Sequence, residues 1–224
     1  MYLSRLTLNP ASRQVQRDIA DCQALHSTIL KAFPLKVPDN GGAREQFGVL
    51  YRAYVDKQGN MHLYVQSHVA PDWQFLRPDY TAAPPVFKPI GELYERITSG
   101  TCLGFTLRAN TTRKTGTTSK TERIQGVQKS NGRRVFLTRF EEQLEWLERK
   151  AQGCGFKVLA VNLRHDDSRG RHAASHRLRF LGVVFEGTLT VTDRVLFLDA
   201  LRQGIGPGKA YGFGLLSVAP RARG

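Results

Sequence analysis

The sequence predicts an α+β protein made of two ferredoxin-like (RRM-like) domains, each with an antiparallel sheet and helices packed on one face. Two observations lead to this prediction. In the second half of the 224-residue chain, apolar periodicity follows the order strand, helix, strand, strand, helix, strand, which is the ferredoxin-like order. A proline-rich stretch at 78–89 separates it from a first half with a looser version of the same order. We therefore place the domains at residues 1–88 and 91–224.

The first half supplies weaker signals for each element. Asp21 is a plausible N-cap for a helix that ends at Pro34, with apolar residues recurring at helical spacing between them. A short helix opening at Pro71 would be the second helix of the domain. Alternating or apolar runs joined by turn residues predict strands at 5–8, 47–55 and 61–66.

The second half is clearer. Thr138 and Glu141 have capping-box spacing and predict a helix that ends at Gly153. Asp193 is expected to cap a second helix that runs to about Gln203. The apolar face of the first helix should consist of Phe140, Leu144, Leu147 and Ala151. Strands are expected at 103–108, 156–163, 178–192 and 215–218.

Composition restricts the class of protein. The chain has 33 Lys and Arg against 19 Asp and Glu, a formal net charge of +14, while 41% of its residues are hydrophobic. That apolar content excludes a disordered basic tail. No apolar run approaches the roughly 18 residues that span a bilayer, so an integral membrane protein is not expected. Three widely spaced cysteines suggest no disulfide framework and fit a reducing cytoplasm. The expected partner is a polyanion.

The positive charge is concentrated in two stretches and a terminal loop. Residues 110–139 are rich in Arg, Lys, Thr and Gly and predict a long basic loop, and residues 164–179 form a second basic stretch. Each could be a solvated charged loop, but two together on a +14 chain favour nucleic acid. The glycine-rich segment 204–214 fits neither the Walker A nor the dinucleotide-binding spacing. It is either a tight helix-to-strand crossover or a phosphate-contacting loop, the latter through Gly206, Gly208 and Lys209.

Four features together resemble the CasE-type CRISPR-associated endoribonuclease family, the RNA-processing subunits of type I-E Cascade complexes. They are the opening segment 1–10, His26, the Phe-Glu-Gly run at 185–187 and the closing segment 204–220. The resemblance covers the whole chain and implies tandem ferredoxin-like domains. It also implies cleavage of precursor CRISPR RNA at the base of each repeat hairpin, without a metal or other cofactor. The product, the mature crRNA, would stay bound. Expected partners are this RNA and other Cascade subunits, and outside the complex the protein would be a monomer.

The resemblance also assigns the catalytic residues. From its spacing alone, His26 would be a half-buried packing histidine, but the family's catalytic histidine falls at this position. Where the family often has a tyrosine one turn earlier, this chain has Gln23, which can orient a hydroxyl or phosphate but has no phenolic proton. The second charged group is left open among His176, Arg177 and Lys31, each of which could equally be an ordinary surface cation.

Metal-free RNA cleavage proceeds most easily by attack of the ribose 2′-hydroxyl, which gives a 2′,3′-cyclic phosphate and a 5′-hydroxyl. Histidine suits the proton transfers because its pKa lies near neutral pH. The basic loop is expected to follow the phosphates of the RNA stem. The alternative is a subunit that holds guide RNA without cutting it. The RNA-binding candidates besides the terminal loop include Arg108 and Asn110, which end the preceding strand and are expected to help place the basic loop. The candidates within that loop are Arg113, Lys114, Lys120, Arg123, Arg133 and Arg134.

Overall fold

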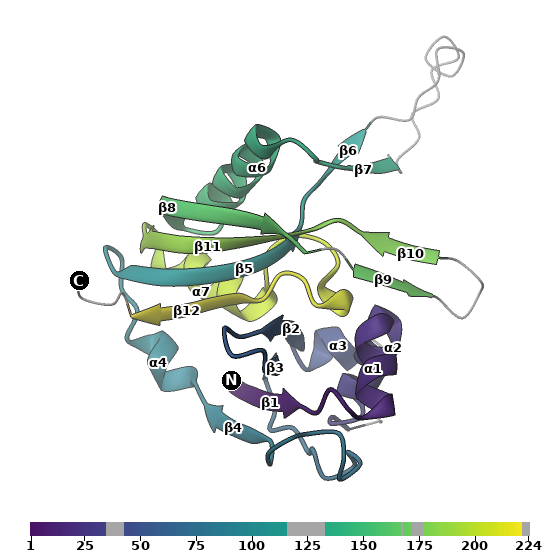
Figure 1. Cartoon of the computed structure of the whole chain (residues 1–224). Helices are drawn as coiled ribbons and strands as arrows, with labels where there is room; N and C mark the ends of the chain where they lie inside the picture. The colour runs from purple at the N-terminus through teal and green to yellow at the C-terminus, as the bar shows by residue number, and fades with distance from the viewer. Residues whose placement is uncertain (35–42, 116–132, 167, 172–176, 221–224) are drawn as a thin grey trace, which may run out of the picture.

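The computed structural model describes residues 1–34, 43–115, 133–166, 168–171 and 177–220 (Figure 1). They form two four-stranded antiparallel sheets, one from residues 2–89 and one from residues 102–220. The domain limits 1–88 and 91–224 themselves stay a prediction. No helix among the described residues is long and apolar enough to cross a membrane.

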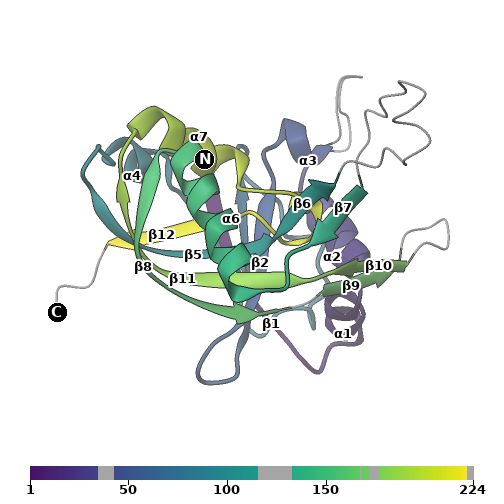
Figure 2. The same ribbon diagram turned by 90° about the horizontal axis from the view of Figure 1, so that it is seen from above.

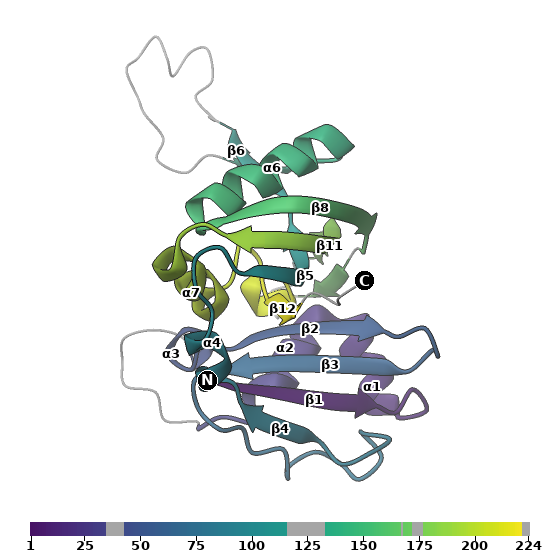
Figure 3. The same cartoon turned by 90° about the vertical axis from the view of Figure 1, so that its left-hand side faces the viewer.

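The first sheet has the strand order β2-β3-β1-β4, with every pair antiparallel. Helices α1 and α2 cover one of its faces, as Figure 3 shows, where they lie behind the strands. The core between them includes Leu6, Val15, Ile29 and Leu63. The elements of this half are β1 (Tyr2–Leu8), α1 (Arg13–Ala20), α2 (Cys22–Leu30), α3 (Ala43–Gln46), β2 (Leu50–Val55), β3 (Met61–Ser67) and β4 (Val86–Pro89).

The first half differs from the sequence prediction in its helices. Helix α1 was not expected; its buried Asp18 accepts hydrogen bonds from the Thr28 hydroxyl (2.7 Å) and the Tyr80 hydroxyl (3.1 Å). The helix expected at Pro71 does not form. Instead the segment between β3 and β4 is irregular and buries Trp73, whose Nε1 donates to the Ser4 hydroxyl (3.2 Å). Tyr80 and Trp73 belong to the apolar core of the first half.

The second sheet has the order β12-β5-β11-β8, which is the same ferredoxin-like order read from the opposite edge. Helices α6 and α7 pack on one face over a core that contains Trp146, Phe185 and Phe197. Figure 2 shows α6 lying across the strands. The elements are α4 (Gly91–Glu95), β5 (Cys102–Asn110), β6 (Thr112–Thr115), β7 (Arg133–Phe136), α6 (Phe140–Gly153), β8 (Phe156–His165), β9 (Ser168–Arg171), β10 (Arg177–Phe180), β11 (Gly182–Val191), α7 (Arg194–Gln203), the 3₁₀ turn η1 (Lys209–Tyr211) and β12 (Leu216–Pro220).

The start of α6 corrects the capping-box prediction. Leu137 donates its N–H to the Thr111 carbonyl (3.0 Å), which keeps the chain extended past Thr138, so Arg139 becomes the N-cap without a side-chain hydrogen bond. The predicted apolar face is also partly wrong, because Phe140 is 54% exposed while Trp146 and Gln143 are buried.

Two predicted segments contain more structure than expected. The ends of the basic loop pair as a hairpin, β6 with β7. The expected strand at 178–192 is broken at residue 181 because its first part pairs with β9 and its second part with β5 and β8. Both corrections arise where a hairpin extends beyond the ends of the central strands β5 and β11 (Figure 1).

The two sheets are joined by specific hydrogen bonds between β2 or β3 and the C-terminal segment. The Tyr51 hydroxyl donates to the Ala210 carbonyl (2.7 Å), and Gln66 Nε2 donates to the Leu201 carbonyl (2.7 Å). Arg52 Nη2 donates to the Ser217 hydroxyl (3.2 Å). These bonds place the glycine-rich loop against the first sheet and its helix α2.

Candidate active site

His26 lies on α2 at the junction of the two sheets. The helix begins where predicted, at Asp21, whose carboxylate accepts a hydrogen bond from the Gln23 N–H (2.9 Å). The His26 ring is half-buried, and its Nδ1 is buried with no hydrogen-bond partner among the described residues. Burial, together with the positive charge of Arg44, lowers the pKa of His26 below its usual 6.5. The imidazole is therefore neutral at neutral pH and able to accept a proton.

The aromatic ring that faces His26 comes from the glycine-rich loop. The ring centroids of His26 and Tyr211 are 6.2 Å apart. Tyr211 also contacts Phe180 of β10, with centroids 4.9 Å apart. Burial and the neighbouring Cys22 raise the pKa of Tyr211, so its phenol keeps its proton at neutral pH. A neutral imidazole and a protonated phenol thus stand side by side.

The backbone of the loop depends on glycine, as two of its positions show. Gly212 has a φ of +80°, and a Cβ there would meet the Tyr51 ring at 3.1 Å. At Gly206 (φ +82°) a Cβ would lie 2.9 Å from the Trp146 ring. Larger residues would be strained at both positions and would crowd the loop against its neighbours.

Arg108 holds this loop in place. Its Nη1 donates to the Gly212 carbonyl (3.3 Å), its Nε pairs with the Asp166 carboxylate (2.8 Å), and its guanidinium lies 4.2 Å from the Phe213 ring centroid. Arg108 is only 7% exposed. Asn110 is also buried, beside Gly208, and its Oδ1 lacks a hydrogen-bond partner among the described residues. Both residues sit beneath the loop.

The structure describes some of the remaining candidates for the second catalytic group but not all of them. Lys31 is the C-cap of α2 and is exposed. The backbone of Arg177 belongs to β10, whose partner strand β9 packs against α2. His176 lies outside the described residues. Gln23 is half-buried on α2, three positions before His26.

The RNA-binding candidates of the basic loop lie at the base of the β6–β7 hairpin. Arg113, Lys114 and Arg134 are exposed, and Lys114 pairs in register with Arg134. Arg134 Nη1 donates to the Thr112 hydroxyl (3.2 Å). Arg133 is placed by its backbone in β7. Lys120 and Arg123 lie outside the described residues.

A cavity of about 390 Å³ connects this hairpin with the glycine-rich loop. Its lining includes Gly206 and three cations, Arg134, Lys150 and Lys209. Burial and the charge of Arg44 lower the pKa of Lys209. The cavity therefore combines three cationic side chains with the backbone of the glycine-rich loop, an arrangement that is suited to a phosphate group.

Three residues of these sites were not predicted from the sequence. Tyr211 and Lys150 are ordinary members of a loop and a helix, and only folding brings them beside His26 and the cavity. Arg44 acts on His26 through its charge from a different element, α3. The one available signal was the glycine-rich context of Tyr211. Among the described residues, no cluster of three or more His, Cys, Asp or Glu side chains is arranged to hold a metal.

Comparison with known proteins places the chain in a family. A family model described as CRISPR associated protein matches residues 1–220. The CRISPR-associated endoribonuclease Cse3 of Thermus thermophilus is 33% identical over 235 residues, which cover 98% of this chain and 100% of that protein. The CRISPR system Cascade subunit CasE of Escherichia coli is 30% identical over 223 residues, with coverage of 98% and 100%.

A solved structure has the same fold. Cse3 bound to a 19-nucleotide RNA is similar to this chain with a TM-score of 0.78 at 33% identity, over 98% of this chain and 100% of that one. This confirms the prediction of tandem ferredoxin-like domains. With a family model over 220 residues and relatives matched over their whole lengths, the chain belongs to the CRISPR associated protein family.

Proposed function

We propose that this protein is a metal-independent endoribonuclease that cuts precursor CRISPR RNA within each repeat, at the base of its hairpin, and retains the processed guide RNA. The observation that carries the proposal is the position of His26, which faces Tyr211 of the glycine-rich loop. The relatives named as CRISPR endoribonuclease and Cascade subunit support the activity and the complex in which it takes place.

In this proposal His26 is the general base. Its lowered pKa leaves the imidazole neutral at neutral pH, so it can remove the proton of the ribose 2′-hydroxyl. The oxygen then attacks the adjacent phosphorus, and the bond to the 5′-oxygen of the next nucleotide breaks. The products are a 2′,3′-cyclic phosphate and a 5′-hydroxyl. The Nδ1 of His26, which has no hydrogen-bond partner in the described part of the chain, supports a functional role, because buried polar atoms are rarely left without a hydrogen bond.

Tyr211 is the proposed proton donor. The departing 5′-oxygen needs a proton, and Gln23 cannot supply one from an amide at the position where the family often has tyrosine. The phenol of Tyr211 lies beside His26 and has a raised pKa, so it carries a proton when the imidazole does not. Gln23, on the same helix as His26, would orient the phosphate by hydrogen bonding. The cation that stabilises the phosphoryl charge is sought among Lys31, Arg177 and His176.

The RNA stem is proposed to lie along the β6–β7 hairpin. Arg113, Lys114 and Arg134 are exposed there, and the adjacent cavity adds Lys150 and Lys209. These cations fit the closely spaced phosphates of an A-form duplex. The relative Cse3, at a TM-score of 0.78, has been solved with RNA bound, which supports an RNA ligand for the same fold.

The proposal is tested with a repeat hairpin RNA in EDTA. We expect cutting to persist without divalent metal and to stop when the ribose before the scissile phosphate lacks its 2′-hydroxyl. Tight binding of an RNA that stays uncut under all conditions would contradict the proposal. It would instead favour the alternative suggested by Gln23, a subunit that holds guide RNA without processing it.

A further inference from the structure

The face of the first sheet opposite α1 and α2 carries an ordered set of basic and aromatic side chains. Alternate residues of a strand share a face, and the strand register places Arg5, Tyr64 and Arg52 in one row across β1, β3 and β2. The next row along the same face contains His62 and Tyr54. In Figure 3 this face is turned toward the viewer.

The aromatic rings of these rows are stacked. Tyr54 and Tyr64 are almost parallel, with an interplanar angle of 5° and centroids 5.4 Å apart. His62 stacks on Tyr54 at 5.2 Å, and its Nε2 is held by the Asp56 carboxylate at 2.9 Å. The rings are therefore fixed in a continuous stack before any ligand binds.

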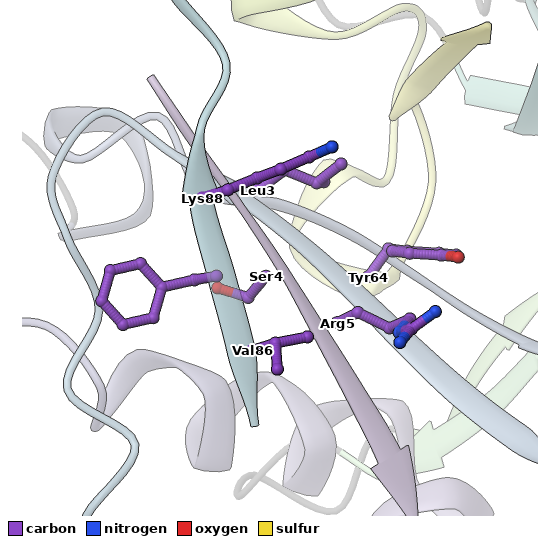
Figure 4. Close-up of a pocket in the computed structure, with 7 residues that line it drawn as sticks. Leu3, Ser4, Arg5, Tyr64, Val86 and Lys88 are labelled. Atoms are coloured by element: carbon purple, nitrogen blue, oxygen red, sulfur yellow. The ribbon is translucent and has the colours of Figure 1, made fainter. Parts of the chain in front are cut away.

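Tyr64 also lines a cavity of about 390 Å³ on this face. Figure 4 shows Tyr64 and Arg5 projecting to the same side of the sheet, with Lys88 farther along β4. Leu3 and Val86 supply apolar walls, and Val86 is 52% exposed. A flat apolar group that entered this cavity would meet the Tyr64 ring and two cations.

Arg52 is a further positively charged residue on this face of the sheet. It is only 8% exposed, its guanidinium lies 5.8 Å from the Tyr54 ring centroid, and its Nε has no hydrogen-bond partner among the described residues. Glu186 of the second sheet is the acidic group that acts on Arg52, while Arg164 adds a further positive charge. The carboxylate of Asp56, the acidic residue of the turn after β2, is hydrogen-bonded to His62 Nε2.

We propose that this face is a second RNA site that binds the single-stranded flank of the repeat, with a base extending the Tyr54–Tyr64 stack in the cavity and Arg5 and Lys88 contacting phosphates. The inference rests on the proposed function, since it requires a precursor RNA. The face lies on the side of the sheet opposite the helix that carries His26, so the RNA must continue beyond the hairpin to reach it.

Single-stranded RNA fits this face better than the other possible occupants. Bases in a duplex are already stacked on each other, whereas unpaired bases are free to stack on aromatic side chains. RNA-recognition modules use the open face of a four-stranded sheet in this way. A protein partner would satisfy the apolar walls but would leave the exposed Arg5 and Lys88 without an obvious anionic ligand.

The test compares three RNAs made uncleavable by a 2′-deoxy substitution: the repeat hairpin alone, and the hairpin with a single-stranded extension of roughly eight nucleotides on its 5′ or its 3′ side. Each extension carries one 2-aminopurine. We expect one extension to tighten binding about fivefold or more, the minimum for one stacked base, and to quench the fluorescence of the 2-aminopurine.

Protein variants then test the residues of the site. Tyr64→Leu should abolish both effects and Tyr64→Phe should keep them. Arg5→Gln should weaken binding of the extended RNA only.

Control measurements keep the outcomes separate. Arg77→Gln removes a similarly exposed arginine from the segment between β3 and β4 and should change nothing. Thermal unfolding confirms that each variant folds. If the wild-type protein binds and cuts the hairpin but gains nothing from either extension, or if Tyr64→Leu keeps the gain, the second site is overturned and the proposed function stands.

Two further results would also overturn the site. If Tyr64→Leu leaves the binding of all three RNAs unaffected but weakens binding to other Cascade subunits, the face docks protein instead of RNA. If the wild-type protein neither binds nor cuts the hairpin, the proposed function fails first, a result distinguished by the hairpin-only RNA.

Discussion

The imidazole of His26 and the phenol of Tyr211 face each other with ring centroids 6.2 Å apart, although one belongs to the second helix and the other to the last loop of the chain. The contact exists because Tyr51 and Arg108 hold the carbonyls of Ala210 and Gly212 and so fix the loop against α2. The proposed base and acid thus come from different halves of the chain, and the geometry of the reaction depends on the junction between the two sheets.

His26→Gln should abolish cutting while leaving the affinity for a repeat hairpin within a few-fold. Loss of a general base typically reduces rate by about 10²- to 10⁴-fold, and no phosphate contact is removed. Single-turnover cleavage and filter binding on the same RNA measure the two effects. His68→Gln, an exposed histidine after β3, is the matched control. Normal cutting by His26→Gln would show that His26 only packs against the loop.

Tyr211→Phe should slow the chemical step by at least about tenfold at unchanged affinity, because the ring contact with His26 stays while the phenolic proton is lost. The double variant Gln23→Tyr with Tyr211→Phe should recover part of the rate, since a phenol is restored one turn before His26. Single-turnover rates at saturating enzyme separate this effect from binding. Equal rates for wild type and Tyr211→Phe would remove Tyr211 from the mechanism.

The cleavage rate should fall on the acid side with a midpoint below 6.5, because burial and Arg44 lower the pKa of His26 and the neutral form is the active one. Arg44→Met removes one of the two causes. The pKa of His26 should then rise, so the acid limb moves to higher pH and the relative rate at pH 6 falls. A pH–rate profile of both proteins measures this, with Arg77→Met as a distant control. A midpoint that stays or moves down would contradict the assignment.

The sequence predicted the order of helices and strands better than it predicted the side-chain contacts between distant parts of the chain. Asp21 and Asp193 were recognisable N-caps, and both accept hydrogen bonds at the starts of α2 and α7. Helix α1 was missed because its buried face holds a carboxylate, Asp18, whose partner Tyr80 lies far away in the sequence. Local patterns report on neighbours along the chain, and such a pairing appears only after folding.

The candidate site shows the same division. His26 was identified through a family resemblance and not through its spacing, which by itself indicated packing. Arg108 was an RNA-binding candidate expected to help place the basic loop that follows it, and in the structure its guanidinium is engaged by Asp166, the Gly212 carbonyl and the Phe213 ring. Composition counts charges but does not distinguish a buried cation that positions a loop from an exposed one that meets phosphate.

Neutralising Lys114 and Arg134 together should weaken hairpin binding and flatten its salt dependence. The two residues are exposed and paired in register on β6 and β7, so both can reach one stretch of backbone. Each lost phosphate contact should reduce the slope of log K against log salt by about 0.7 to 0.9. The change is measured by titrating the double variant Lys114→Gln, Arg134→Gln against the hairpin at several salt concentrations. Arg77→Gln controls for net charge.

Because the substitutions in β6 and β7 lie away from His26, the single-turnover rate at saturating enzyme should remain that of the wild type. A slope that matches the wild type would place the RNA stem elsewhere on the protein.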